Sequence, residues 1–441
     1  MYKTITMEQT RHKEIVAGLD IGTTKIVAII GTINEHGKLE ILGMARTESL
    51  GVSRGVVTHI TQTIDAIQKV MREAEEISGY EIGKVNVGIA GQHIRSIQHS
   101  GSRMRENIET EITQLDINKL IKEMYKLVML PGEKVIDVLP QDFTVDNEKG
   151  IHDPIGMAGV RLEANFHIIT GNIAAARNIV KCVAGADMEV ENLILEPLAS
   201  ADAVLSKEEK EAGVVLVDIG GGTTDVAIFK EGIIRHTAVI PFGGNIITED
   251  IKHGCSIIKS QAEQLKVKFG SALSETASSN EIVSIPGLRG REPKEISLVN
   301  LASIIQSRVE EIIEQVYYEI RNSGLEKQLI AGIVVTGGGS QLRNITQLFE
   351  FLTGMDTRIG YPTEHLANGA EDITSPMYST GVGLILKGFE RISTNTDETV
   401  SAVKQPIEQV EGMAKKSGMI NFLDMIKKKS DTFFADSDLT D

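Results

Sequence analysis

The sequence contains no tryptophan, only two cysteines and no long apolar segment. Two cysteines cannot form a disulfide framework, so Cys182 and Cys255 are each expected to be small buried residues. No apolar run approaches the roughly 18 residues that a membrane-spanning helix needs. Residues 1–14 are polar and lack the apolar centre of a signal peptide. We therefore expect an intracellular protein without a transmembrane segment.

Positive charge is also scarce. The 441 residues include 45 Lys and Arg against 61 Asp and Glu, which gives a net charge of −16. A general nucleic-acid-binding protein needs a basic face, so we expect no nucleic-acid partner. Any contact with an anionic membrane must come from a local basic segment. The 41% hydrophobic content is that of an ordinary folded protein, and the length allows about three domains of roughly 150 residues.

The sequence contains two glycine-rich hairpins with the same pattern of residues. In residues 213–230, GVVLVDIGGGTTDVAIFK, an apolar strand ends at Asp218, glycines follow, and Asp225 opens the return strand. Residues 17–31, AGLDIGTTKIVAIIG, repeat the device around Asp20. A single DxGxT is a common surface turn, but the pair indicates an internal duplication. Glycines let a backbone offer its N–H groups to a phosphate, and threonines add hydroxyl donors. The candidate phosphate-binding residues are Asp20, Gly22, Thr23, Thr24, Lys25, Gly220, Gly221, Gly222, Thr223 and Thr224.

The two hairpins could close on one nucleotide from both sides. Asp20 and Asp218 would then face each other across the phosphates and hold a Mg²⁺ ion. We expect the contact to run through water, because Mg²⁺ dehydrates reluctantly. The expected cofactors are therefore ATP and Mg²⁺.

A third element, residues 333–340 (IVVTGGGS), again runs from a strand into glycines and then into an expected helix, 341–352. Three such elements in this order resemble the actin/Hsp70/sugar-kinase superfamily, with two phosphate loops and an adenosine loop. The resemblance implies an adenosine and ribose site at Gly243, Gly244, Glu263, Lys266, Gly337, Gly338, Gly339 and Ser340. The pair Glu263 and Lys266 fits an exposed ion pair one helical turn apart equally well.

Glu196 stands before Pro197 at an expected helix start. From the residues alone it fits a carboxylate that stabilises the positive end of a helix. The resemblance to Hsp70, which has a Glu-Pro-x-Ala at this place, implies instead a side chain that orients water. With that role, the expected catalytic residues are Glu196, Asp218 and Asp225.

The stretch 51–55, GVSRG, matches the pattern of a hydrolase nucleophile elbow. That motif needs a strand directly before the serine, whereas residues 47–50 are polar, so we expect a glycine-rich loop. Elsewhere, apolar periodicity and breaker residues predict a mixed α/β chain. The expected helices are 59–78, 115–128 (starting at Thr113 or Asp116), 172–183, 297–322 and 378–389, the last with Gly381 and Gly383 at close packing contacts. The expected strands include 84–91, 134–145 and 166–170, the last resuming the main sheet, and 271–290 is expected to be a loop.

The chain changes character near its end. Residues 392–414 are polar and predict a flexible linker. Residues 415–435 predict an amphipathic helix with lysines beside its apolar face, as in helices that lie at a membrane surface. Such a helix also fits docking on its own domain or on a partner. The candidate membrane-binding residues are Met419, Ile420, Phe422, Leu423, Ile426, Lys427, Lys429, Phe433 and Phe434.

With this tail included, the chain resembles the FtsA family of actin-like bacterial cell-division proteins. The stretches that carry the resemblance are DIGTTK (20–25), GIAGQHI (88–94), HDPIGMAGVRLE (152–163), LEPLASA (195–201), DIGGGTTD (218–225), PFGGNIITEDI (241–251), AEQLK (262–266) and TGGGS (336–340). The resemblance implies an actin-like ATPase fold: two duplicated RNase H-like halves with inserted subdomains 1C and 2B, followed by the amphipathic helix. It places subdomain 1A at 14–85, 164–210 and 360–391, 1C at 86–163, 2A at 211–242 and 329–359, and 2B at 243–328.

The resemblance also implies partners and a location. They are filaments of the chain itself, the FtsZ tail bound through 2B, later division proteins bound through 1C, and lipid at the cytoplasmic face of the membrane at the division site. ATP hydrolysis would be weak at most. The chain departs from the family pattern in its N-terminal extension and in the acidic residues 436–441, which would oppose anionic lipid. The alternative is a small-molecule kinase of the same fold, since fold does not decide function.

Overall fold

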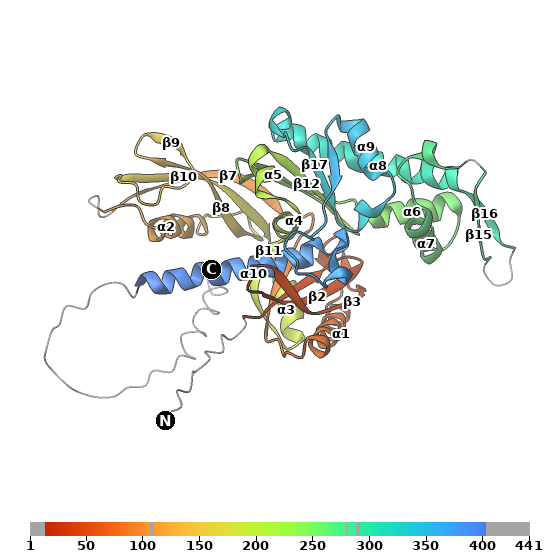
Figure 1. The fold of residues 1–441 in the computed structure, drawn as a ribbon, viewed down its shortest axis with the longest axis horizontal. Coiled ribbons are helices and arrows are strands. Elements are labelled where there is room, and N and C mark those ends of the chain that lie inside the picture. The colour runs from red at the N-terminus through yellow and green to blue at the C-terminus, as the bar shows by residue number, and fades with distance from the viewer. Residues whose placement is uncertain (1–13, 106–109, 279, 288–291, 403–441) are drawn as a thin grey trace, which may run out of the picture. The chain divides into compact units, whose positions relative to one another are not determined.

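The computed structural model describes residues 14–105, 110–278, 280–287 and 292–402 (Figure 1). Contacts divide the chain into two compact units, Met1–Ser393 and Thr394–Asp441. All the strands described below belong to the first unit. The expected amphipathic helix at 415–435, its acidic end and the N-terminal residues 1–13 lie outside the described residues.

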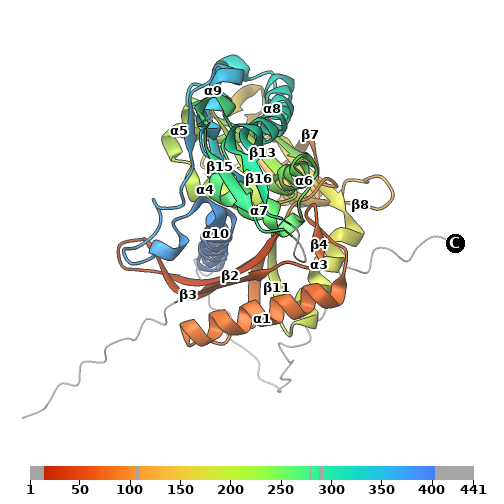
Figure 2. The ribbon, with the colours of Figure 1, turned by 90° about the vertical axis from the view of Figure 1, so that its right-hand side faces the viewer.

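The first of two main sheets has five strands among the described residues, in the order β11-β6-β1-β2-β3. They are β1 Val16–Ile21, β2 Lys25–Ile33, β3 Leu39–Glu48, β6 Lys84–Ile89 and β11 Glu189–Leu195. Strands β1 to β3 form an antiparallel meander, and β6 pairs parallel to β1 on its other side. Helix α1, Ile60–Ser78, lies on one face of this sheet and helix α10, Ser379–Ala402, on the other (Figure 2).

The second main sheet repeats this topology. Its order is β14-β13-β12-β17-β18 in the described chain, with a meander of β12, β13 and β14 and a parallel pairing of β17 to β12. The strands are β12 Val214–Ile219, β13 Thr224–Lys230, β14 Ile233–Ile240, β17 Ile333–Thr336 and β18 Thr357–Ile359. Strand for strand, it matches the first sheet, so the predicted internal duplication is confirmed.

The central strands are continuous apolar runs because helices cover both faces of each sheet. Every residue of β1 and of β12 is buried. Helix α1 buries Ile67, Val70, Met71 and Ala74 at helical spacing and ends at Gly79, which has a left-handed φ of 75°. The remaining helices that frame the two sheets are α3 Ile173–Gly185, α4 Glu196–Val204, α5 Lys207–Ala212, α8 Leu298–Asn322 and α9 Ile345–Thr353.

A separate sheet is inserted into the first half, between β6 and α3. Its order is β7-β10-β8-β9 in the described residues, with its own apolar core that includes Phe166 and Leu120. Its elements are β7 Arg95–Met104, α2 Gln114–Met124, β8 Glu133–Val145, β9 Glu148–Ile151 and β10 Arg161–Asn172.

Two predictions fail in this inserted region. Residues 166–170 do not resume the main sheet, because β10 pairs with β7 and β8 instead. An apolar pattern predicts a strand but not its neighbour. Helix α2 begins after the expected cap at Thr113, which forms a capping box. It ends at Met124 rather than Val128, because Val128 is 97% exposed and has no packing to hold another turn.

The inserted sheet also contacts the edge strand of the second half. Arg235 on β14 forms an ion pair of 2.7 Å with Asp142 on β8. The His167 ring bonds Thr237 Oγ1 through Nε2 at 3.0 Å and Gln98 Nε2 through Nδ1 at 3.1 Å. Burial lowers the pKa of His167 to about 4, so its neutral ring serves as a hydrogen-bonding bridge. The inserted sheet, which is part of the first half in sequence, is therefore held by hydrogen bonds and an ion pair to the second half as well.

The second half carries its own insertion before α8. It consists of α6 Gly244–Cys255, α7 Lys259–Phe269 and a short hairpin of β15 Ile282–Ile285 and β16 Lys294–Ser297. The prediction of a loop over 271–290 is therefore wrong in part. Four residues are too few for a periodic pattern, and the strand forms because Ile285 and Ile296 are buried in the insertion.

Two further helix boundaries differ from the prediction. Helix α9 begins at Ile345, after the 3-10 turn Gly338–Gln341, rather than at residue 341. Helix α10 runs to Ala402, into the predicted linker 392–414. The sequence from 390 to 402 is polar but has no glycine or proline. Polarity indicates exposure to water and does not prevent a helix.

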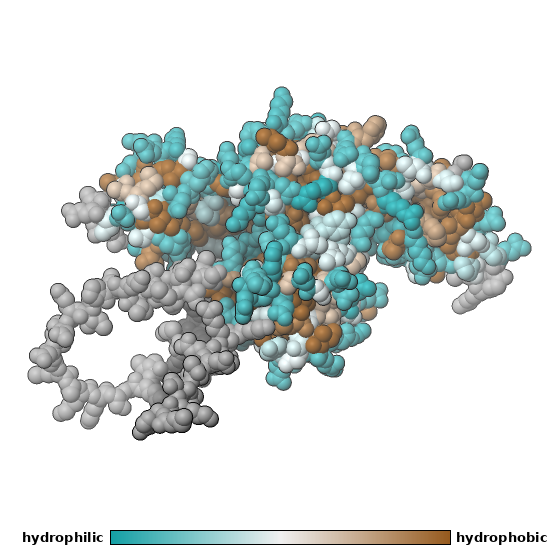
Figure 3. Space-filling model, in the orientation of Figure 1, coloured by the Kyte–Doolittle hydropathy of each residue, from teal (hydrophilic) through white to brown (hydrophobic). Residues whose placement is uncertain are grey.

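No helix in the described ranges is long and apolar enough to cross a bilayer. On the face drawn in Figure 3, hydrophilic and hydrophobic residues of the described chain are interspersed. Cys182 and Cys255 are buried free thiols, as predicted.

Candidate nucleotide site

The turns of the two predicted hairpins meet in one pocket. A Cβ added to Gly221 would lie 2.4 Å from Thr24 Cγ2, and one added to Gly222 would lie 2.6 Å from Thr23 Oγ1. Glycine is therefore required for this approach of the two halves. The pocket is lined by Asp20, Ile21, Gly22, Thr23, Thr24, Lys25, Gly55, Glu196, Asp218, Gly220, Gly221, Gly222, Thr223, Asp225, Gly337, Gly338, Met377 and Thr380.

All but one of the predicted phosphate-binding residues line this pocket. The exception is Thr224, whose side chain is buried and donates a hydrogen bond of 2.8 Å to the carbonyl of Phe242. Its hydroxyl holds the second hairpin against the following turn and does not line the pocket. A strand alternates its side chains between two faces, so neighbouring threonines of one motif serve different purposes.

Four carboxyl groups share the pocket. Burial raises the pKa of Asp20 to about 6 and that of Asp225 to about 8, and the charge of Asp218 adds to both shifts. Burial also raises the pKa of Asp218, and it holds that of Glu196 well above its ordinary value. Among the described lining residues, Lys25 is the one cation, and its charge lowers the pKa of Asp20, Glu196 and Asp218 against the effect of burial. Lys25 is therefore the one positive charge available in this lining to balance any of these carboxyl groups that ionise.

Asp218 and Asp225 differ in their hydrogen bonds. Asp218 Oδ2 accepts bonds from Ser200 Oγ at 2.6 Å and from Thr380 Oγ1 at 3.3 Å. Asp225 Oδ2 accepts one from Thr223 Oγ1 at 3.2 Å, while its Oδ1 is buried without a partner. A buried acceptor without a partner is rare and indicates a place for water or an ion.

The position of Glu196 is compatible with both of its predicted interpretations. It opens helix α4, with Pro197 in the first turn, and its side chain lines the pocket beside the other carboxyl groups. A Cβ added to Gly88 would lie 2.9 Å from Glu196 Cγ, so the glycine of β6 makes room for this side chain.

The predicted adenosine residues divide into two groups. Gly337 and Gly338 line the pocket. Gly337 has φ +81°, and a Cβ there would meet Asp218 Oδ1 at 2.2 Å. The other predicted residues, Gly243, Gly244, Glu263, Lys266, Gly339 and Ser340, are not among those that line it.

Part of the second group forms a cluster behind the pocket. Glu263 and Lys266 form the predicted ion pair at 2.8 Å, and Lys266 Nζ donates to the carbonyl of Gly244 at 2.9 Å. A Cβ on Gly243 would lie 2.7 Å from the carbonyl oxygen of Gly220. The cluster therefore supports the turn that backs the second phosphate loop.

Several residues around the site were not predicted to belong to it. Ser200 lies in the stretch LEPLASA on α4, Thr380 lies on α10, and Met377 lies in the 3-10 turn Pro376–Tyr378 before α10. The packing of α4 and α10 brings Ser200 and Thr380 to Asp218, and Met377 lines the pocket. The stretch 51–55 forms a loop only in part, because Val52–Ser53 make the short strand β4, and Arg54 and Gly55 form a tight turn to β5 Val56–Val57. Its Gly55 lines the pocket and donates its N–H to Thr23 Oγ1 at 3.1 Å. The glycines Gly51 and Gly55 are the sequence feature that could have indicated a loop beside the pocket.

The residues present fit a hydrated cation and a phosphate chain. In the described part of the chain, no three His, Cys, Asp or Glu side chains converge closely enough to hold a metal directly. Asp20 and Asp218 nevertheless line the same pocket, and Asp225 Oδ1 is buried without a hydrogen-bond partner. Mg²⁺ that keeps its waters needs this kind of loose carboxylate setting, and glycine N–H groups suit phosphate.

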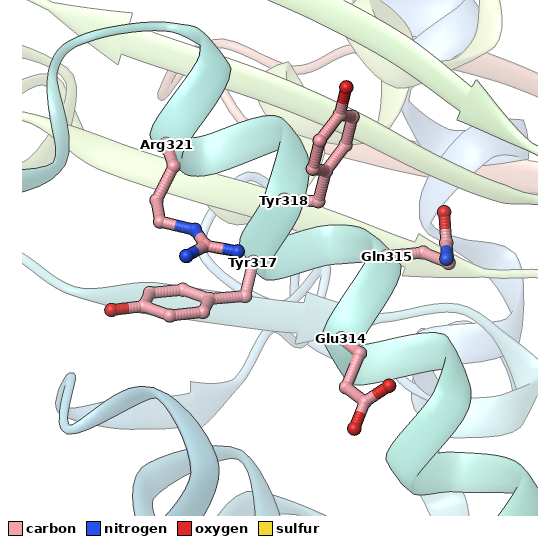
Figure 4. Close-up of a pocket in the computed structure, with 5 residues that line it drawn as sticks. All are labelled: Glu314, Gln315, Tyr317, Tyr318 and Arg321. Atoms are coloured by element: carbon pink, nitrogen blue, oxygen red, sulfur yellow. The ribbon is translucent and has the colours of Figure 1, made fainter.

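A second hollow lies on the outer side of α8 (Figure 4). It is lined by Glu314, Gln315, Tyr317, Tyr318 and Arg321. The Arg321 guanidinium lies 5.0 Å from the Tyr317 ring centre, and Tyr317 donates its hydroxyl to Glu326 at 2.5 Å. All five lining residues come from one helix and include no glycine loop, so this hollow is not a candidate for nucleotide.

Comparison with known proteins places this geometry in a family. One family model, "Cell division protein FtsA", matches residues 215–383, and another, "SHS2 domain inserted in FTSA", matches residues 91–170. The second match coincides with the inserted sheet. The cell division protein FtsA of Pseudomonas aeruginosa is 40% identical over 397 residues, which cover 90% of this chain and 94% of that protein.

Solved structures with the same fold share little sequence. A chain of a PilM–PilN type IV pilus biogenesis complex aligns with a TM-score of 0.62 and 14% identity, over 85% of this chain and 98% of that one. MreB 5 of Spiroplasma citri, solved bound to AMPPNP, aligns with a TM-score of 0.50 and 15% identity, over 88% and 98%. These similarities show the actin-like ATPase fold. The identity to the Pseudomonas aeruginosa protein over nine-tenths of the chain shows more: this chain belongs to the family of the cell division protein FtsA.

Proposed function

We propose that the chain binds Mg·ATP between the two glycine hairpins. The observation that carries this proposal is the meeting of two duplicated turns in one pocket, which is lined by the three buried aspartates Asp20, Asp218 and Asp225 and by Glu196. The phosphates would lie against the N–H groups of the glycines and against Lys25. Asp20 and Asp218 would hold Mg²⁺ through its waters. The bound ion would add positive charge to the pocket.

The remaining site residues take roles around this nucleotide. Gly337 and Gly338, followed by Gly339 and Ser340, would face the adenosine. The pair Glu263 and Lys266 would support the ribose side from behind the turn at 243–244. Glu196 would orient water near the terminal phosphate and Asp225 would assist, with weak hydrolysis at most. The AMPPNP bound to MreB 5, a protein of the same fold, supports the nucleotide proposal.

We further propose that the chain is an assembly adaptor in cell division. It would form actin-like filaments, bind the FtsZ tail through 2B and recruit later division proteins through 1C. Residues 415–435 would anchor it to the cytoplasmic face of the membrane at the division site. ATP would favour one filament-competent conformation because the two conformations differ in nucleotide affinity. Membership of a cell-division family favours this function over the kinase alternative.

The proposed subdomains keep their bounds except for 1C and its borders with 1A. The first main sheet and its helices would form 1A, and the second main sheet would belong to 2A. Residues 243–328, with α6, α7, the β15–β16 hairpin and α8, would form 2B. The inserted sheet would form 1C. Because β6 belongs to the first main sheet and the inserted sheet runs from Arg95 to Asn172, we move the bounds of 1C from 86–163 to 95–172.

Flotation on anionic vesicles tests the adaptor. The full chain is compared with a chain that ends at Ala402, which keeps α10 whole, and each is mixed with FtsZ, with and without Mg·ATP. We expect the full chain to float and to carry FtsZ with it, more strongly with Mg·ATP because assembly adds avidity. The shortened chain should stay at the bottom. Flotation of both chains, or of neither, would contradict the anchoring role of residues 415–435.

A matched control separates the apolar face of that segment from its charge. The double substitution Phe422→Gln and Ile426→Gln removes apolar area, adds no charge and leaves every lysine in place. We expect it to abolish flotation, because interfacial binding scales with buried apolar area. Flotation that survives this change but fails at high salt would indicate attraction by the lysines alone.

A further inference from the structure

An arginine occupies a backbone conformation that favours other residues. Arg54 and Gly55 form the two-residue turn between β4 and β5, and both have positive φ, at 49° and 74°. A turn of this kind favours Asn-Gly or Asp-Gly, and a residue with a long side chain is disfavoured in the left-handed region. A strained residue beside a functional site suggests that its side chain has a use there.

The turn lies where the phosphate loops of the two halves meet. Gly55 donates its N–H to Thr23 in the first loop at 3.1 Å. A Cβ added to Gly222 in the second loop would lie 3.0 Å from the Cα of Arg54. Arg54 itself is exposed. Its Cα is therefore fixed against both loops, while its long side chain is at the surface.

The charges in the pocket suggest that a bound phosphate would need a second cationic side chain. Of the described residues that line the pocket, Lys25 alone is cationic, against four carboxyl groups. A triphosphate would add further negative charge. The planar guanidinium of arginine binds phosphate oxygens through paired hydrogen bonds and keeps its charge in any protein environment.

We propose that Arg54 binds the terminal phosphate of the bound nucleotide. The exposed guanidinium would turn onto that phosphate when a triphosphate occupies the pocket. ADP would lack this contact, so Arg54 would make the chain prefer ATP. This inference rests on the proposed binding of Mg·ATP, and the experiment below separates failure of the one from failure of the other.

The test measures dissociation constants for ATP and ADP, each with Mg²⁺, by calorimetry on the full chain. Arg54→Ala should weaken ATP about tenfold or more and ADP less than twofold, because one charge-assisted contact is lost. Arg54→Lys should recover most of the ATP affinity. Arg54→Gly provides the matched control, since glycine accepts the positive φ without strain but has no charge. It should weaken ATP as much as Arg54→Ala does.

The outcomes discriminate between charge and structure. If Arg54→Gly binds ATP as the unmodified chain does, the arginine serves the backbone and the inference fails. Equal weakening of ATP and ADP by Arg54→Ala also overturns it, because the turn would then hold the loops in place. If the unmodified chain binds neither nucleotide, the proposed function fails and the inference fails with it. Thermal unfolding of each variant without nucleotide confirms that the fold is retained.

Discussion

The substitution Asp225→Asn should stabilise the nucleotide-free protein at alkaline pH. Burial raises the pKa of Asp225 from 3.8 to about 8, so the folded state retains a proton that the unfolded state releases. Stability contributed by this group therefore falls as pH rises from about 4 to 8. Because asparagine does not ionise, the variant should not lose stability from this position as the pH rises.

The size of the effect follows from the shift. One unit of pKa corresponds to about 1.4 kcal/mol. Between pH 6 and pH 8.5, the free energy of unfolding of the unmodified protein should fall by about 2–3 kcal/mol from this group alone. Urea unfolding at the two pH values measures the fall, with Asp372→Asn as a control at an exposed carboxylate. Mg·ATP should reduce the fall, because a bound cation stabilises the ionised form.

Two results would refute this reasoning. One is an Asp225→Asn variant that loses as much stability between pH 6 and 8.5 as the unmodified protein does. The other is an Asp372→Asn control that flattens the profile as strongly. Either result would mean that the buried charge of Asp225 does not set the pH dependence of folding.

Three further predictions concern the structure around the site. Gly337→Ala should destabilise the protein by about 2–4 kcal/mol and prevent ATP binding, because its Cβ would meet Asp218 at 2.2 Å with φ at +81°. Gly338→Ala, which meets no atom within 4 Å, should leave the urea midpoint nearly unchanged, and equal effects of the two substitutions would contradict the geometry. Arg235→Ala should cost about 1–2 kcal/mol, since it breaks the half-buried ion pair with Asp142 between the inserted sheet and the second half. In a double-mutant cycle, Asp142→Ala should then add little, and full additivity would mean that the pair is not formed. Lys25→Ala should raise the pKa of Asp20 further, because the lysine charge opposes the effect of burial. Carboxyl resonances followed by NMR during a pH titration would detect this shift, and an unchanged Asp20 would contradict the shared pocket.

The sequence predicted the parts of the site that depend on local backbone chemistry. Glycines beside an aspartate at a strand end favour a turn, so the sequence predicts the two turns at Asp20 and Asp218, which line one pocket in the structure. The sequence predicts only that Gly381 and Gly383 lie at close packing contacts, and it does not identify α4 as the helix that packs against them. In the structure a Cβ on Gly383 would lie 1.8 Å from the carbonyl oxygen of Ala199. This approach brings Ser200 and Thr380 to Asp218, and no local pattern reports it.

The failures share a physical origin. Residues 166–170 were correctly predicted as a strand, but pairing depends on chain segments far away in sequence. The strand Ile282–Ile285 was missed because four residues carry too little pattern. The end of α10 was misplaced because a polar composition was taken for a linker. Thr224 was assigned to phosphate because its motif is repeated, although its place in the β13 register turns it toward Phe242.

A crystal structure of the chain with Mg²⁺ and a non-hydrolysable ATP analogue tests the central claim most directly. We expect the phosphates to lie between the loops at 20–25 and 218–225, with a hydrated ion facing Asp20 and Asp218. Electron density for the analogue at another surface, or an empty pocket at saturating analogue, would contradict it.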